Sequence, residues 1–150
     1  MPFLDAYNDN GYGDGFYNVS AAVGNHCHNM VEDVMLVQFF LKKFYERFPS
    51  PKGELKVDGV CDPVTSTWIK AFQTLMKNTV HPDGIISRAR TGTPRSSKTQ
   101  TVYTIIWLNK FIRMKDEDNQ WFLNLFSNPN VPPRLRPLFS EYGRAGKDVE

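Results

Sequence analysis

The chain has 150 residues and a mass of 17.2 kDa, which is the size of one ordinary domain. A hydrophobic fraction of 41% and a charged fraction of 23% are typical of globular proteins and exclude a disordered chain. Two cysteines exclude a disulfide-dense secreted scaffold, and no apolar run reaches the roughly 18 residues that a membrane helix needs. We therefore expect one folded domain with no membrane insertion.

The first five residues, Met-Pro-Phe-Leu-Asp, contain neither the basic region nor the long apolar region of a signal peptide. The sequence therefore predicts a protein that is cytoplasmic as made. Export to the periplasm or the cell wall would then require a non-classical route.

The net charge of +2 is distributed unevenly along the chain. Residues 1–41 contain five acidic side chains and no Lys or Arg, whereas a stretch of seven basic side chains without an acidic one comprises Arg88, Arg90, Arg95, Lys98, Lys110, Arg113 and Lys115. Such a stretch either forms a solvated loop or presents a basic surface to anions. The pI of 8.5 falls short of the strongly basic character of nucleic-acid binders, so no nucleic acid is expected as a partner.

The N-terminal segment, residues 1–28, is rich in Gly, Asn, Asp and Tyr and shows no periodicity, which predicts an irregular arm. Its aromatic and aliphatic side chains are expected to pack on the body of the protein: Phe3, Leu4, Phe16 and Tyr17. The first helix is predicted to begin at Asn29 as N-cap, with Glu32 completing a capping box. Its apolar positions recur at spacings of three and four as far as Phe48, and Pro49 ends it.

Three more helices follow in the sequence. Asp62-Pro63 predicts the start of the second helix, whose apolar face comprises Trp68, Ile69, Phe72, Leu75 and Met76. A long polar loop over residues 87–101 precedes a third helix over about 101–114. A fourth helix is predicted to start from Asp118 as its cap. We expect it to bury four apolar side chains: Trp121, Phe122, Leu125 and Phe126.

Two Asp-Gly turns flank the second helix, in the segments Val57-Asp58-Gly59 and Pro82-Asp83-Gly84. Between and around them stand, in order, Leu36-Val37-Gln38, Pro63-Val64-Thr65, Phe72-Gln73 and Leu108-Asn109. This order and spacing resembles the peptidoglycan-binding domain family over about residues 29–112. The resemblance implies a mainly helical fold with a small three-helix core, extended by residues 1–28 and by a helical and extended segment over 113–150.

The matching residues are mainly signatures of this scaffold: Gly59, Pro63, Phe72, Gln73 and Gly84. Gly59 and Gly84 can adopt a positive φ at little cost, and Gln73 is expected to hydrogen-bond the backbone of a turn and so fix the loop between helices. The chain departs from the family in having Asp62 where Gly usually precedes the proline, Cys61 where an aromatic residue is common, and a long loop over 87–101.

The resemblance implies a non-catalytic module that recognises bacterial cell-wall peptidoglycan, in a groove near the two Asp-Gly turns. Basic side chains suit the carboxylates of its stem peptides. The candidate ligand-binding residues are Asp58, Thr65, Asp83, Arg88, Arg90 and Arg95. The alternative is the same fold used as a protein-interaction adaptor in a bacterial secretion or phage-tail-like assembly, as the aromatic-rich ends suggest. A small cell-wall hydrolase or toxin is the least favoured interpretation.

The sequence offers little for catalysis or metal binding. His26, Cys27, His28 and the distant Cys61 lack the spacing of a metal site, because neighbouring side chains diverge, and no second ligand motif accompanies them. A nucleophilic Cys27 would need an adjacent base and an orienting residue, which no motif provides. Asp58 and Asp83 lie in turns, where capping is their expected role. We therefore expect no enzyme activity, no metal and no cofactor.

Overall fold

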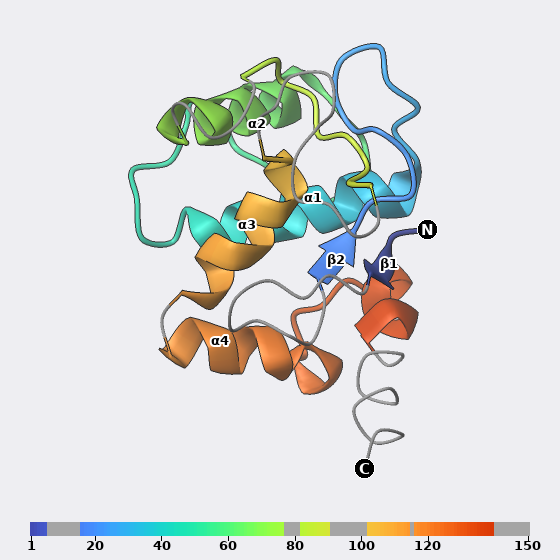
Figure 1. Ribbon diagram of the computed structural model, residues 1–150, viewed down its shortest axis with the longest axis vertical. Coiled ribbons are helices and arrows are strands. Elements are labelled where there is room, and N and C mark those ends of the chain that lie inside the picture. Colours follow the sequence, from blue (N-terminus) through green and yellow to red (C-terminus); the bar gives the residue numbers. More distant parts are fainter. Residues whose placement is uncertain (6–15, 77–81, 91–101, 115, 140–150) are drawn as a thin grey trace.

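The computed structural model describes residues 1–5, 16–76, 82–90, 102–114 and 116–139, and it is mainly helical (Figure 1). This confirms the predicted fold class. The elements in chain order are β1 (Phe3–Asp5), β2 (Phe16–Asn18), α1 (Val31–Phe44), α2 (Pro63–Leu75), α3 (Thr104–Arg113), α4 (Asp116–Leu123) and two short 3-10 turns, η1 (Leu125–Ser127) and η2 (Pro133–Leu135).

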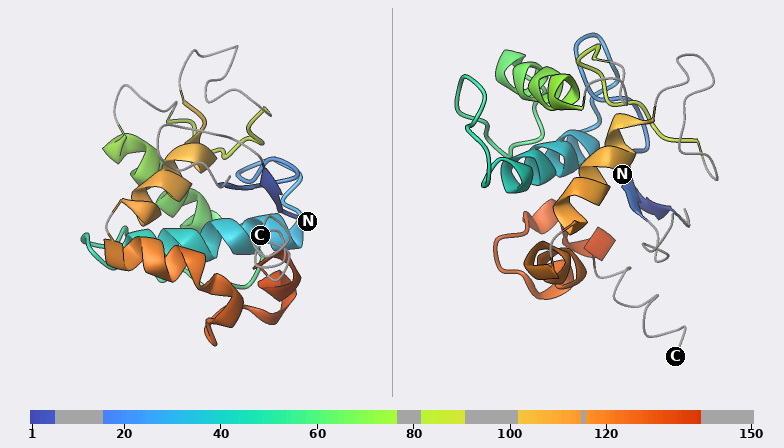
Figure 2. Two further views of the ribbon diagram at one scale, coloured as in Figure 1. Left: turned by 60° about the horizontal axis from the view of Figure 1, so that its bottom comes forward. Right: turned by 60° about the vertical axis from the view of Figure 1, so that its left-hand side comes forward.

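Helix α1 is the centre of the fold. Figures 1 and 2 show it between α2 on one side and α4 on the other, with α3 crossing it. Every residue from Asp33 to Leu41 is buried, because the apolar side chains of this run cover all sides of the helix rather than one stripe. A helix of this kind needs neighbours all around it, and the terminal segments of the chain provide them.

The N-terminal arm is part of the core. The arm predicted as irregular contains two short antiparallel strands, in which Leu4 pairs with Tyr17. Tyr17 is fully buried, and its ring lies 6.0 Å from that of Phe40, 5.3 Å from that of Phe122 and 5.0 Å from that of Phe139. One side chain of the arm therefore joins α1 to both halves of the C-terminal segment.

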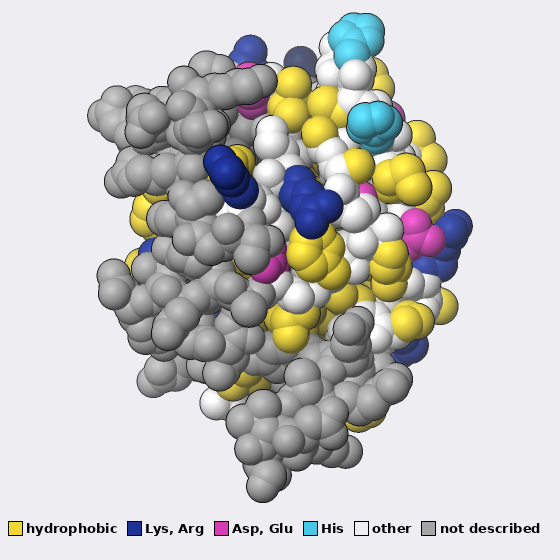
Figure 3. Space-filling model, turned by 45° about the vertical axis from the view of Figure 1, so that its right-hand side comes forward, with side chains coloured by type: hydrophobic (Ala, Val, Ile, Leu, Met, Phe, Trp, Pro, Cys, Tyr) yellow, Lys and Arg dark blue, Asp and Glu magenta, His cyan; other side chains and the backbone are white. Residues whose placement is uncertain are grey.

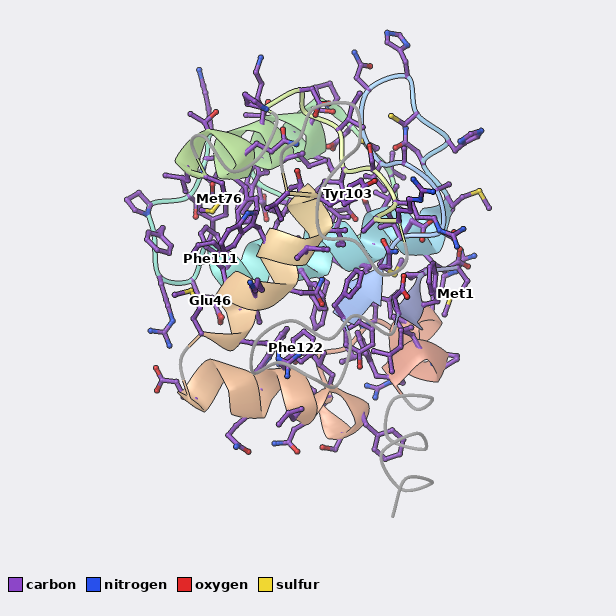
Figure 4. All side chains as sticks on the ribbon, in the orientation of Figure 1. Met1, Glu46, Met76, Tyr103, Phe111 and Phe122 are labelled. Carbon is purple, nitrogen blue, oxygen red and sulfur yellow. The ribbon has the colours of Figure 1, made fainter. Side chains whose placement is uncertain are left out.

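The C-terminal segment covers the other side of α1. Phe122 lies between α4 and α3, as Figure 4 shows, and the guanidinium of Arg113 lies 4.7 Å from the centre of its ring. After α4, the chain buries Leu125, Val131, Leu135, Leu138 and Phe139. The fourth helix starts at Asp116 rather than at Asp118, and Phe126, which was predicted to be buried, is 52% exposed.

The predicted start of α1 was wrong. Met30 is the N-cap and makes no side-chain cap bond, while Asn29 adopts a left-handed conformation with φ 52°. The amide of Asn29 is turned to the preceding loop, where it bonds Gly24 and Cys27, so it cannot cap the helix. The helix also ends at Phe44, four residues before the predicted end, although the exposed Phe48 stacks on Phe44 with 4.9 Å between ring centres.

The predicted start of α2 is confirmed. Pro63 occupies the first turn, and the carboxylate of N-cap Asp62 accepts hydrogen bonds from the backbone N–H of Thr65 at 2.8 Å and from its hydroxyl at 2.9 Å. The hydrogen bond from the Thr65 backbone is the main cause that lowers the pKa of Asp62. Asp62 therefore contributes more stability when it is ionised than when it is protonated.

This cap gives a pH-dependent prediction. Asp62→Ala will lower the free energy of unfolding by about 1 kcal/mol at neutral pH. Because the folded-state pKa is below the unfolded value, the ionic part of the cap is fully present above about pH 4 and disappears as the pH falls through the folded-state pKa. Asp62→Asn keeps the acceptor but cannot ionise. Urea unfolding should therefore show a gap between wild type and Asp62→Asn that closes in acid, and a gap independent of pH would contradict the assignment.

Candidate functional site

A buried glutamine of α1 holds the first Asp-Gly turn. The side-chain oxygen of Gln38 accepts hydrogen bonds from the backbone N–H groups of Asp58 and Gly59 at 3.0 and 2.9 Å. Its amide nitrogen donates to the Val60 carbonyl at 2.9 Å, the Thr65 hydroxyl at 3.0 Å and the Asp58 carboxylate at 3.2 Å. We call these five residues the first clasp: Gln38, Asp58, Gly59, Val60 and Thr65.

A second clasp repeats this arrangement on α2. The oxygen of Gln73 accepts from the backbone N–H of Gly84 at 2.7 Å. Its nitrogen donates to the Ile85 carbonyl at 2.9 Å, the Thr104 hydroxyl at 3.0 Å and the Asp83 carboxylate at 3.3 Å. The second clasp thus comprises Gln73, Asp83, Gly84, Ile85 and Thr104. In both clasps a helix binds the following Asp-Gly turn and the first turn of the next helix.

The clasps confirm the predicted role of Gln73 and include two further residues, Gln38 and Thr104, to which the sequence analysis assigned no role. Gln73 binds the backbone of a turn as expected. Gln38 and Thr104 have the equivalent roles but were assigned none. The one signal for Gln38 was its position as the single polar residue in the apolar run from Val34 to Leu41. A polar side chain at a core position of a helix needs hydrogen-bond partners, and here the turn provides them.

A third side-chain amide, that of Asn109 on α3, binds the backbone of a strand instead of a turn. Asn109 accepts from the backbone N–H of Tyr17 at 2.8 Å and donates to its carbonyl at 3.0 Å, which fixes β2 against the helix. The next residue of β2, Asn18, bonds both backbone groups of Ala89, at 2.9 and 3.1 Å. The N-terminal arm therefore links α3 to the segment that follows the second clasp.

These bonds determine what the candidate ligand-binding residues can do. The Thr65 hydroxyl is fully buried between Gln38 and Asp62, so it is a scaffold group out of reach of a ligand. Asp58 and Asp83 are exposed, but one carboxylate oxygen of each is held by a clasp and by the backbone N–H two residues later. The two carboxylates thus serve primarily to shape the turns.

The basic candidates lie outside the clasps. Arg88 and Arg90 are exposed on either side of the buried Ala89, whose backbone Asn18 holds in place. The Arg88 guanidinium lies 4.8 Å from the centre of the Phe3 ring. Both arginines therefore extend from a fixed backbone toward solvent. Arg95 lies outside the described residues.

Residues 24–29, which we call the bridging loop, pack against the second Asp-Gly turn. A Cβ on Gly24 would lie 2.7 Å from the Gly84 carbonyl oxygen, and a β-bridge joins the preceding residue, Val23, to Ile86. On this face, Figure 3 shows histidine side chains at the surface beside hydrophobic ones. Exposed apolar residues close to the loop include Met30 at 47% and Val60 at 60%.

The chemistry of the bridging loop does not favour a nucleophile. Burial, with smaller effects of Cys61 and Asp83, raises the pKa of the Cys27 thiol, and burial likewise raises that of Cys61. A nucleophilic cysteine needs the opposite shift. Among the described residues, no group of three His, Cys, Asp or Glu side chains is placed to hold a metal ion. In the same part of the chain, no helix is long and apolar enough to cross a membrane.

No protein-family model, curated protein or solved structure matches the chain. The interpretation of its function therefore depends on its own residues, namely the two clasps, the exposed arginines and the bridging loop.

Proposed function

We propose that this protein is a non-catalytic binding module for bacterial cell-wall peptidoglycan. The observation that carries the proposal is the pair of clasps, in which Gln38 and Gln73 bind the two Asp-Gly turns in the same manner. The resemblance to peptidoglycan-binding domains implies such fixed turns between packed helices. Because a scaffold alone does not specify a ligand, the proposal also needs a surface that suits peptidoglycan.

The segment after the second clasp offers that surface. Arg88 and Arg90 extend toward solvent a few residues beyond the Asp83 turn. Peptidoglycan stem peptides carry carboxylates, which arginine binds through paired, charge-assisted hydrogen bonds. Because Asn18 holds the backbone between the two arginines, the backbone itself needs little further ordering on binding.

The state of the remaining polar groups supports a role without catalysis. The Thr65 hydroxyl is buried, the Asp58 and Asp83 carboxylates are engaged by the clasps, and the raised pKa values of both thiols keep them protonated at neutral pH. General acid–base or nucleophilic catalysis needs groups that are poised near neutrality and open to substrate.

The direct test is co-sedimentation with purified bacterial sacculi at low and moderate salt. We expect the wild-type protein to bind saturably, and Arg88→Ala combined with Arg90→Ala to weaken binding at least about tenfold, because charge-assisted hydrogen bonds contribute about 1.5–3 kcal/mol each. The matched control replaces two exposed lysines elsewhere, Lys52 and Lys70, with alanine. It removes the same charge and should leave binding unchanged.

Three results would count against the proposal. Absence of saturable binding by the wild-type protein would exclude peptidoglycan as the ligand. An equal loss in the arginine and lysine variants, abolished by moderate salt, would reveal a nonspecific charge effect. Release of soluble fragments from the sacculi would instead indicate a hydrolase.

A protein-interaction adaptor is the second candidate. The terminal segments, as far as the structure describes them, are built into the core through Tyr17, Phe122 and Phe139, which removes the support that the aromatic-rich ends gave it. The exposed Met30, Val31 and Val60 now favour it instead. A photo-crosslinking residue at Val60 should capture a discrete protein if this candidate is right, whereas the same residue at exposed Lys52 should not.

A further inference from the structure

The sheet of β1 and β2 holds the segment of chain that presents Arg88 to solvent. We infer that this sheet is a functional part of the binding site, in which Phe3 and Asn18 are positioning residues that place the Arg88 guanidinium for a carboxylate of the ligand. The inference rests on the proposed function. It extends the site from the two arginines to the N-terminal strands.

The two faces of this sheet point to different parts of the molecule. Tyr17 points to the aromatic core, where it contacts the rings of α1 and of the C-terminal segment. Asn18 is the next residue of β2, so its side chain lies on the opposite face. Phe3 pairs directly with Asn18 in the antiparallel register, so its side chain shares that face. The face with Phe3 and Asn18 is therefore the one that meets the segment of Arg88.

Asn18 fixes the backbone beside Arg88. Its side-chain nitrogen donates to the Ala89 carbonyl at 2.9 Å, and its side-chain oxygen accepts from the Ala89 N–H at 3.1 Å. Both residues are fully buried, so water does not compete for these bonds. Three residues earlier, Ile86 exchanges two backbone hydrogen bonds with Val23, at 2.9 and 2.8 Å. The main chain is therefore held on both sides of Arg88.

Phe3 holds the other end of the Arg88 side chain. The central carbon of the guanidinium lies over the Phe3 ring, 4.8 Å from its centre. The ring face attracts a cation electrostatically, and this contact uses none of the N–H groups of the guanidinium. In the part of the chain that the structure describes, Arg88 makes no hydrogen bond or ion pair. Its donors thus stay available to a ligand while the side chain is restrained at both ends.

This restraint lowers the cost of binding a carboxylate. A mobile arginine side chain loses rotamer freedom when it binds, whereas one that is already placed loses less. The guanidinium can then donate two parallel hydrogen bonds to the carboxylate. Arg90 has no aromatic ring of the described residues over it. We therefore expect Arg88 to contribute more to the affinity than Arg90 does.

The test is a double-mutant cycle, measured by co-sedimentation with purified sacculi at low salt. Phe3→Leu keeps an apolar side chain but removes the ring, and it should weaken saturable binding about two- to fivefold, the range of an exposed cation–π contact. Phe3→Tyr keeps the ring and should bind like the wild type. In the Arg88→Ala protein, Phe3→Leu should have no further effect, because the group that the ring places is gone.

A second measurement needs no ligand. Protons above an aromatic ring are shielded, so the Nε–H signal of Arg88 in a proton–nitrogen NMR spectrum should lie upfield of its usual position. Its loss in Arg88→Lys assigns the signal. The upfield shift should persist in Phe3→Tyr and disappear in Phe3→Leu. Backbone signals far from β1 should be unchanged in both variants, which shows that the fold is retained.

The outcomes separate this inference from the proposed function. Absence of saturable binding by the wild type would overturn the proposed function, and with it any role of Phe3 in binding. Wild-type binding that Phe3→Leu leaves unchanged, or weakens equally in the Arg88→Ala protein, would overturn the positioning role alone. An Arg88 signal that does not respond to loss of the ring would also overturn it, because the contact would then not form in solution.

Discussion

Gln38→Ala will lower the free energy of unfolding by about 3–5 kcal/mol. The substitution removes an amide that makes five hydrogen bonds and is 1% exposed. It leaves the Gly59 N–H buried without its partner, and it removes one partner of the buried Thr65 hydroxyl, which keeps its bond to Asp62. An unsatisfied buried group costs more than the hydrogen bond itself contributed. Urea unfolding at neutral pH measures the change.

The chain provides a matched pair of controls for this prediction. Gln73→Ala breaks the equivalent clasp on α2 and should destabilise the protein by a comparable amount, because Gln73 is also 1% exposed and makes four hydrogen bonds. Gln120→Ala, at an exposed position of α4, should change the free energy of unfolding by less than about 0.5 kcal/mol. If Gln38→Ala behaved like Gln120→Ala, the clasp would not hold the turn.

Gly59→Ala will destabilise the protein by about 3 kcal/mol, whereas Gly84→Ala will cost only about 1 kcal/mol. Both glycines have a left-handed backbone, with φ of 79° and 75°, so both substitutions carry the conformational cost of a Cβ in that region. They differ in the space available. A Cβ at Gly59 would lie 2.6 Å from the Val31 side chain and 2.9 Å from its carbonyl oxygen, but at Gly84 it would meet nothing within 4 Å.

The glycine pair separates conformational strain from steric overlap at two turns of the same kind. Val31→Ala removes the side chain that a Cβ at position 59 would meet first. The double variant Gly59→Ala with Val31→Ala should therefore recover part of the stability that Gly59→Ala loses. The recovery should be incomplete, because the carbonyl oxygen of residue 31 remains close to the added Cβ. Equal effects of the two glycine substitutions would mean that the start of α1 moves away freely. Thermal and urea unfolding of the four variants provides the comparison.

Much of the fold could be predicted because the signals are local. Asp62-Pro63 specified the start of α2, since an N-cap carboxylate acts on N–H groups only three residues away. The apolar faces of the helices followed from their spacing, although Leu75 and Phe126 are exposed. Periodicity shows which residues share a face but not whether a neighbour covers the end of a helix.

The candidate site was predicted less well, because the roles of its residues depend on partners in other elements of the fold. Asp58, Thr65 and Asp83 were selected as residues that meet a ligand, yet each is bonded within a clasp. Their partners, Gln38 and Gln73, belong to other elements. The exposed Arg88 and Arg90 remain the candidates for ligand contact.

The sequence alone was sufficient to derive the mainly helical class, the start of α2, the two Asp-Gly turns and the bond from Gln73 to one of them. These features depend on backbone preferences and on neighbours close along the chain. The tertiary structure was needed to show that Gln38 faces the first turn 20 residues away, that Asn109 binds β2 across 92 residues, and that Asn29 serves the bridging loop. Contacts over such separations depend on how α1 packs with every element around it, which no local pattern encodes.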